Sequence, residues 1–184
     1  MKKHGPYTIK SSKCLHRDEF IELRVDEVIR PNGEPGQYAT ARMVPGVAVL
    51  PLDEEGFVYL VRQFRYGVGK ECVETVAGAV DEGEGPEEAA RRELREELGI
   101  EAEEMVGLGL VDAITSQADS PSHVFLARGL RFREKDPDDT ERLEPIKVRL
   151  GEAVRMVMES EITQATSGLL ILKGDNFLRR VRDS

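Results

Sequence analysis

The chain has 184 residues, of which 40% are hydrophobic and 33% charged, a length and composition that suit a globular protein with a sizeable core. Its formal net charge of −9 argues against nucleic acid as a partner, since proteins that bind the phosphate backbone usually present a basic surface. The longest apolar runs, such as residues 47–50 and 169–172, are far shorter than the roughly 20 residues of a membrane helix, so we expect no membrane association.

The cysteines and the first residues bear on the cellular compartment. Cys14 and Cys72 are too few for a disulfide framework or a zinc cluster. No apolar run follows the charges of residues 1–5, so no secretory signal is visible. We therefore expect a cytoplasmic protein in which both cysteines have structural roles.

The first 45 residues are expected to form an antiparallel strand subregion. Residues 20–25 alternate apolar and charged side chains with the period of a strand. The Pro-Asn-Gly sequence at 31–33 predicts a turn, and residues 36–43 can return as a second strand. We place a boundary after residue 45, with residues 46–184 forming the second domain.

The rest of the chain mixes strands and helices. Residues 47–50 are typical of a buried strand, residues 53–56 of a hairpin turn and residues 57–61 of the returning strand. From Pro86 the apolar period becomes helical. Further strands are expected at residues 74–80, 106–114, 124–127 and 146–150, and further helices at residues 152–159 and 167–181. This mixed order predicts an α/β fold with a mixed sheet between layers of helices.

The helix that is predicted to begin at Pro86 carries three carboxylates on one face. Pro86 suits the first helical position, and Gly99 suits the left-handed residue that follows a helix end. The helical period places Glu93, Glu96 and Glu97 together. An apolar stripe that can dock on the sheet lies beside them and consists of Ala90, Leu94 and Leu98.

The three carboxylates of this face repel one another, and two kinds of cation can offset the repulsion. Arg92 stands four residues from both Glu88 and Glu96, a spacing at which ion pairs form on a helix. A hard divalent cation offsets far more, and a ligand set of carboxylate oxygens is typical of Mg²⁺ or Mn²⁺ sites. The helix alone also allows a second interpretation, a solvated face with weak ion pairs.

Residues 78–100 resemble the Nudix box. The box reads Gly, five residues, Glu, seven residues, Arg-Glu, an aliphatic residue, any residue, Glu-Glu, any residue, Gly and an aliphatic residue. Each specified position is matched, by Gly78, Glu84, Arg92, Glu93, Leu94, Glu96, Glu97, Gly99 and Ile100. The resemblance implies a Nudix α/β/α sandwich with a mixed sheet, and divalent-metal-dependent hydrolysis of a nucleoside diphosphate linked to another group.

The resemblance also implies roles for individual residues. The divalent metal would be held by the carboxylates of Glu93, Glu96 and Glu97 and by the backbone carbonyl of Ala77. Glu84 corresponds to an acidic residue that is either an outer metal ligand or a support for the site. Arg92 corresponds to the arginine that orients a catalytic glutamate through an ion pair. Catalytic roles are thus expected for Arg92, Glu96 and Glu97.

Outside the box the chain is similar to the branch of ADP-ribose and nucleoside-diphosphate-sugar pyrophosphatases. The sequence Val-Arg-Gln-Phe-Arg at 61–65, the approach to the box at 74–78 and a later strand at 123–127 carry this similarity. It implies Mg²⁺-dependent hydrolysis to a nucleoside monophosphate and a sugar phosphate, with Mn²⁺ able to substitute. The strands of residues 1–45 imply a homodimer formed by their exchange.

Substrate-binding residues are expected in two regions. Arg62 and Arg65 are candidates for the diphosphate, because a guanidinium group binds phosphate bidentately. Glu74 belongs to the same branch pattern and is expected at the substrate site. Phe20 and Tyr38 are candidates for stacking on the base, with core packing as the alternative.

The sequence leaves the identity of the substrate open. Residues 115–121 lack the Ser-Pro-Gly sequence of many ADP-ribose enzymes, and the chain has no Trp to stack on a base, so ADP-ribose and another sugar nucleotide are both retained. Hydrolysis of a nucleoside triphosphate or a dinucleotide is a further alternative. A non-catalytic nucleotide-sensing domain is a third, although the complete set of box glutamates argues against it.

The general base is expected in an acidic segment after the box. Residues 138–145 contain Glu141 and Glu144, and Glu144 lies just before a predicted strand. The resemblance favours this segment, because the branch often takes its base from such a loop. A solvated loop without a catalytic role, or a base from the box such as Glu96, are the alternatives.

Overall fold

The computed structural model describes residues 1–133 and 143–182. Its contacts divide the chain into two compact units. Unit 1 comprises residues 1–45 and 112–121, and unit 2 comprises residues 46–111 and 122–184. Within the described ranges, the helices are too short or too polar to cross a membrane.

Unit 1 is a five-stranded sheet in the order β1-β2-β3-β4-β10. Its strands are β1 (Lys2–His4), β2 (Tyr7–Arg17), β3 (Ile21–Ile29), β4 (Pro35–Met43) and β10 (Ala118–Asp119). Neighbours from β1 to β4 are antiparallel, whereas β10 runs parallel to β4. The predicted strands at 20–25 and 36–43 and the turn between them are confirmed. The prediction missed β1 and β2, because their Lys- and Ser-rich sequence lacks an apolar alternation.

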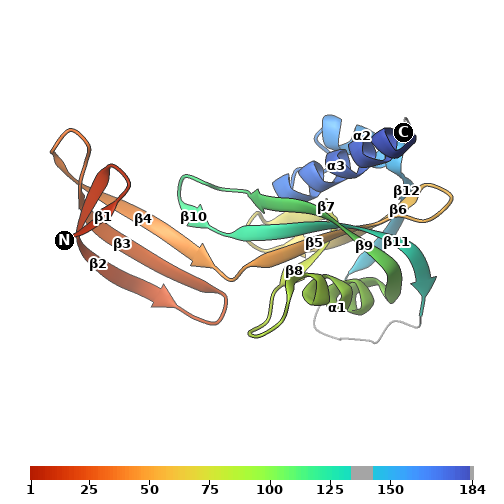
Figure 1. The fold of residues 1–184 in the computed structure, drawn as a ribbon, viewed down its shortest axis with the longest axis horizontal. Helices are drawn as coiled ribbons and strands as arrows, with labels where there is room; N and C mark the ends of the chain where they lie inside the picture. The colour runs from red at the N-terminus through yellow and green to blue at the C-terminus, as the bar shows by residue number, and fades with distance from the viewer. Residues whose placement is uncertain (134–142, 183–184) are drawn as a thin grey trace. The chain divides into compact units, whose positions relative to one another are not determined.

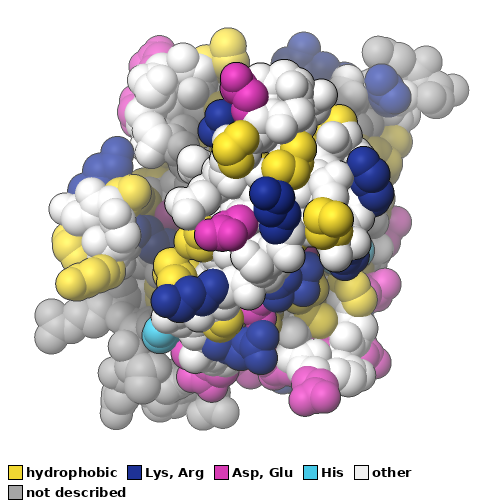
Figure 2. All heavy atoms as spheres, turned by 90° about the vertical axis from the view of Figure 1, so that its left-hand side faces the viewer, with side chains coloured by type: hydrophobic (Ala, Val, Ile, Leu, Met, Phe, Trp, Pro, Cys, Tyr) yellow, Lys and Arg dark blue, Asp and Glu magenta, His cyan; other side chains and the backbone are white. Residues whose placement is uncertain are grey.

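The unit 1 sheet has little core of its own. Val28 is the one buried hydrophobic residue among those described in this unit, while Phe20, Leu23 and Met43 are exposed. Ion pairs instead link its strands, as between Arg42 and Asp119, whose side chains meet at 3.1 Å. On the face drawn in Figure 2, basic and acidic side chains lie interspersed with hydrophobic ones. The sheet therefore offers faces that a partner surface can cover.

Unit 2 contains two sheets. The four-stranded sheet has the order β8-β5-β11-β9, with β8 (Val76–Ala79), β5 (Gly46–Pro51), β11 (Pro121–Phe132) and β9 (Ile100–Asp112). The three-stranded sheet has the order β12-β6-β7, with β12 (Glu144–Arg149), β6 (Phe57–Arg65) and β7 (Lys70–Glu74). In the first sheet β5 pairs parallel to β11 and antiparallel to β8, so the sheet is mixed, as predicted.

Helices cover both sides of these sheets (Figure 1). The helices are α1 (Pro86–Leu98), α2 (Leu150–Met158) and α3 (Ala165–Arg182). One core cluster joins Leu50 and Leu60 to α2 and α3, and the other joins Val49 and Val61 to α1. Because neighbouring strand residues point to opposite faces, β5 and β6 contribute side chains to both clusters. The predicted α/β/α sandwich is confirmed.

The structure corrects the path of the chain at two places. The turn at residues 53–56 forms, but β5 and β6 lie in different sheets, and an isolated bridge joins Leu52, just after β5, to Val58. The predicted strand at 74–80 is likewise two strands in different sheets, since Glu74 ends β7 and Val76 begins β8. Apolar alternation predicts a strand but does not say which sheet it joins.

Candidate active site

Local signals fix the ends of α1 where the sequence predicts them. Pro86 is its first residue, and the Glu88 carboxylate accepts a hydrogen bond of 2.8 Å from the Gly85 backbone N–H just before it. Gly99 adopts a left-handed conformation with φ of 64° and donates its N–H to the Arg95 carbonyl. These caps fix the first and last residues of α1, while burial of Ala89, Ala90 and Leu94 against the sheet sets the direction of its carboxylates.

Arg92 is the centre of an ion-pair network on α1. Its guanidinium forms a two-pronged contact with Glu84, at 3.1 and 3.0 Å. It also donates to Glu93 at 2.6 Å and to Glu96 at 3.2 Å. A further bond of 2.9 Å reaches the backbone carbonyl of Ala79 at the end of β8. The expected Arg92–Glu96 pair is confirmed.

Glu88 differs from its predicted role. Instead of pairing with Arg92, its carboxylate caps the helix start at Gly85, and Glu84 takes the place beside the guanidinium. The reason is geometric, because Glu84 lies in the loop that folds back along α1. Arg92 thus ties this loop, β8 and two helix carboxylates together.

The carboxylates around Arg92 lie in unequal environments. The Arg92 guanidinium lowers the pKa of Glu84 below its usual range. Burial raises the pKa of Glu93, against the opposing effect of Arg92. Glu97 is 7% exposed, whereas the Glu96 side chain is half exposed. The helix face therefore carries two largely buried carboxylates, Glu93 and Glu97, a state that a cation stabilises.

The backbone of β8 packs closely against the Glu93 carboxylate of this network. A Cβ atom built at Gly78 would overlap the Glu93 carboxylate. Gly78 and Ala77 pair with Val47 and Ala48 of β5, so their backbone is held by the sheet. Glycine at position 78 is thus required by close approach of a side chain, and the Ala77–Gly78 backbone lies next to the helix face that carries Glu93.

The donor chemistry of this face fits a hard divalent cation. The carboxylates of Glu93, Glu96 and Glu97, with the backbone carbonyl of Ala77, are all oxygen donors, as Mg²⁺ and Mn²⁺ prefer. Across residues 1–133 and 143–182, however, no three acidic, His or Cys side chains converge into a ready metal cage. Arg92 explains this, because it draws Glu93 and Glu96 to its guanidinium. A cation would compete with Arg92 for these oxygens.

Arg65 and Glu74 form a second network on the neighbouring strands β6 and β7. The Arg65 guanidinium makes three contacts of 2.6–3.2 Å with the Glu74 carboxylate. Glu74 is 2% exposed, while the Arg65 side chain stays partly exposed. Since a buried carboxylate fixes the fork of a guanidinium, Glu74 fixes the orientation of Arg65.

The structure separates Arg62 from Arg65. Residues at β6 positions 58 and 60 pack in the α2–α3 cluster, and strand alternation places Arg62 on that same face. Arg65 shares instead the face of Val61, which packs with α1. Arg62 pairs with Glu144 at 3.4 Å, and the two are opposite each other in the β6–β12 ladder. Arg62 and Glu144 therefore lie away from the α1 carboxylates, and Glu141 lies outside the described residues.

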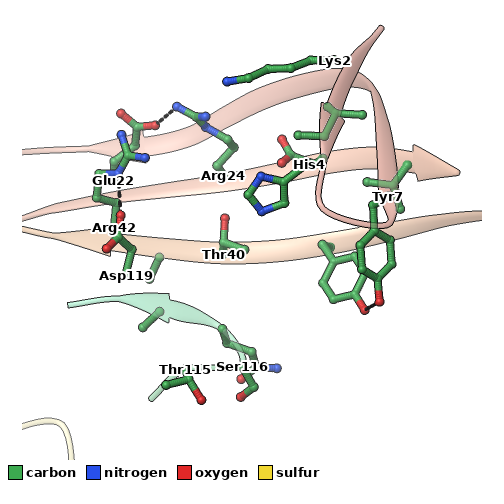
Figure 3. Close-up of a pocket in the computed structure, with 17 residues that line it drawn as sticks. Lys2, His4, Tyr7, Glu22, Arg24, Thr40, Arg42, Thr115, Ser116 and Asp119 are labelled. Atoms are coloured by element: carbon green, nitrogen blue, oxygen red, sulfur yellow. Dashed lines mark hydrogen bonds and ion pairs between the residues drawn. The ribbon is translucent and has the colours of Figure 1, made fainter. Parts of the chain in front are cut away.

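Phe20 and Tyr38 both belong to unit 1. Tyr38 packs edge-on against Tyr7, with ring centres 5.2 Å apart and hydroxyls 2.9 Å apart. It lines a cavity of about 530 Å³ (Figure 3), and the segment 115–119 lines the same cavity. Phe20 is exposed outside that lining. The structure thus unites two features that the sequence singled out separately, Tyr38 and the loop after the box.

Comparison with known proteins agrees with this geometry. The NUDIX domain family profile matches residues 42–164, and the chain belongs to the Nudix family. It is 34% identical over 155 residues to an ADP-ribose pyrophosphatase of Bacillus subtilis (strain 168), covering 83% of this chain and 84% of the relative. An ADP-ribose pyrophosphatase of Mycobacterium tuberculosis is 34% identical over 179 residues, covering 92% and 84%. A crystal structure of an ADP compounds hydrolase superposes with a TM-score of 0.81 at 22% identity, covering 97% of each chain.

Proposed function

We propose that the protein is a pyrophosphohydrolase that cleaves the diphosphate of a nucleoside diphosphate sugar, giving a nucleoside monophosphate and a sugar phosphate. The observation that carries the proposal is the complete box, folded so that Arg92 gathers Glu84, Glu93 and Glu96 beside the Gly78 backbone. The two ADP-ribose pyrophosphatases at 34% identity support the sugar-nucleotide class.

Magnesium is the proposed cofactor, with manganese as a substitute. The residues that would hold it are Ala77, through its carbonyl, and Glu93, Glu96 and Glu97, through their carboxylates. When bound, a divalent cation neutralises charge on the diphosphate oxygens and lowers the pKa of attacking water. Arg92 holds Glu93 and Glu96 through the same guanidinium nitrogen, and a bound cation would draw these two carboxylates away from it.

Arg65 is the better placed of the two arginine candidates for the diphosphate. It lies on the β6 face shared with the α1 cluster, and the buried Glu74 orients its guanidinium. Arg62 is engaged with Glu144 on the other face, and its phosphate contact stays a prediction. The base-stacking roles of Phe20 and Tyr38 stay predictions as well, as does the cytoplasmic location.

The general base is proposed to come from Glu144, Glu141 or Glu96. The position of Glu96 supports its role as the base, because its half-exposed carboxylate lies on the helix face that carries Glu93. The Glu144 carboxylate is exposed and only weakly held by Arg62 at 3.4 Å, but it lies away from the α1 carboxylates. Hydrolysis rates of the Glu141→Gln and Glu144→Gln variants test the two loop candidates, and a variant with an unchanged rate excludes its residue. Unchanged rates in both would move the role to a box residue such as Glu96.

The function is tested by product analysis over ADP-ribose, GDP-mannose, UDP-glucose and dGTP in the presence of Mg²⁺. We expect at least one sugar nucleotide to yield a nucleoside monophosphate and a sugar phosphate, and EDTA to abolish its turnover. Hydrolysis of dGTP alone would replace the proposed substrate class. Nucleotide binding without hydrolysis of any compound would support the sensing alternative instead.

We also propose a homodimer that forms through residues 1–45. Its support is the unit 1 sheet, which holds one buried hydrophobic residue among those described and exposes Phe20, Leu23 and Met43. Such a sheet gains stability when a second copy covers it. Light scattering at micromolar concentration is expected to give the mass of a dimer. A monomer at that concentration would contradict exchange of this region.

A further inference from the structure

Thr75 occupies the point at which the chain passes from one sheet of unit 2 to the other. The β6–β7 ladder ends with Glu74, and the β5–β8 ladder begins with Val76. Thr75 belongs to neither ladder and is fully buried. A buried backbone N–H needs a hydrogen-bond acceptor, and at this crossing the sheets do not supply one.

A side chain from the far end of the chain supplies the acceptor. The Ser167 hydroxyl accepts the Thr75 backbone N–H at 3.0 Å and shares a second hydrogen bond of 3.1 Å with the Thr75 hydroxyl. Ser167 is 2% exposed. It lies in the first turn of α3, where its own N–H donates to the Gln164 side-chain oxygen at 2.6 Å. The capped start of α3 thus fixes the hydroxyl that holds the crossing.

The residues on either side of the crossing belong to the proposed active site. Glu74, immediately before Thr75, orients Arg65. Ala77, the proposed metal ligand, and Gly78, against which the Glu93 carboxylate packs, follow Thr75 by two and three residues. A shift of Thr75 therefore displaces Glu74 and the Ala77–Gly78 backbone together, because both lie within three residues of it along the chain. Arg65 would follow Glu74 through their ion pair.

We propose that Ser167 is a positioning residue of the active site, acting through Thr75 on both the Arg65–Glu74 pair and the Ala77–Gly78 backbone. This inference rests on the proposed function. Ser167 does not touch the reacting groups. It acts at a distance by fixing the crossing, so its loss is expected to alter substrate affinity and metal affinity together.

The Ser167→Ala variant tests the proposal. It leaves the buried Thr75 N–H without its acceptor, and the crossing then shifts to find another one. We expect about a tenfold fall in kcat/KM, in the range found when the residues that support metal ligands are removed. We also expect a higher KM and about a tenfold weaker Mn²⁺ affinity in calorimetry. The Ser167→Thr variant keeps the hydroxyl and is expected to recover most of both losses.

The matched control is Ile162→Val. Ile162 is buried in the α2–α3 core cluster just before α3, so its truncation destabilises the same region without touching the crossing. All variants are assayed well below their melting temperatures. Equal kcat/KM and equal Mn²⁺ affinity in Ser167→Ala and Ile162→Val would overturn the positioning role. If the wild type hydrolyses no compound of the panel, the proposed function fails, and the Mn²⁺ affinities alone decide the role of Ser167.

Discussion

The Glu97→Gln variant is expected to lose at least about a hundredfold in kcat/KM with Mg²⁺ while it stays folded. Glu97 is buried on the helix face that carries Glu93, and a neutral amide is a poor ligand for a hard cation. A loss of about 3 kcal/mol of transition-state stabilisation gives this factor. The fold is expected to survive, because Gln has nearly the same shape and burying a neutral group costs less than burying a charge.

Thermal unfolding separates a ligand from a structural residue. Wild-type protein is expected to melt at a higher temperature in Mg²⁺ than in EDTA, since binding to the folded state stabilises it, and Glu97→Gln is expected to lose this difference. Glu87→Gln is the control, because Glu87 lies on the same helix in an exposed ion pair with Arg91 and such pairs contribute little. Full activity in Glu97→Gln would refute the ligand assignment. A Glu97→Gln variant that loses activity and also melts at a lower temperature than the wild type in EDTA would indicate a structural role.

The helix that presents these carboxylates was predictable because its determinants are local. Pro86 and Gly99 mark its ends, and the spacing of the glutamates fixes their shared face. The partners of Arg92 were less predictable. Spacing along the helix identified Glu96, but Glu84 reaches the guanidinium only because its loop folds back along α1.

The arrangement of the strands was only partly predictable from the sequence. The separation of Arg62 from Arg65 could have been predicted, since residues three apart on a strand point to opposite faces, but both were expected at the diphosphate. The change of sheet between Glu74 and Val76 was not visible, because alternation says nothing about which ladder a strand joins. The contact of Thr75 with Ser167 spans 92 residues, and a hydroxyl within an apolar approach to the box was its one local signal.

Gly78→Ala is expected to lower kcat/KM by about 10–100-fold, the range seen when the support of a metal ligand is disturbed. The added methyl group overlaps the Glu93 carboxylate. Because Gly78 is paired with Val47 in the sheet, the backbone cannot retreat, and the carboxylate must move away from Arg92. Overpacking of this kind costs about 1–3 kcal/mol, at roughly 2–4 °C of melting temperature per kcal/mol for a chain of this size. Steady-state kinetics and thermal unfolding measure the two effects.

A double-mutant cycle shows whether Glu93 transmits the effect. Truncation by Glu93→Ala removes the overlapping carboxylate, so adding Gly78→Ala to it is expected to cost much less stability than Gly78→Ala costs alone. Activity is expected to stay low in the double variant, because the proposed metal ligand is gone. Gly67→Ala is the matched glycine control, since a Cβ at that position meets no atom within 4 Å. Wild-type kinetics in Gly78→Ala, or additive stability losses in the cycle, would show that the β8 backbone does not position Glu93.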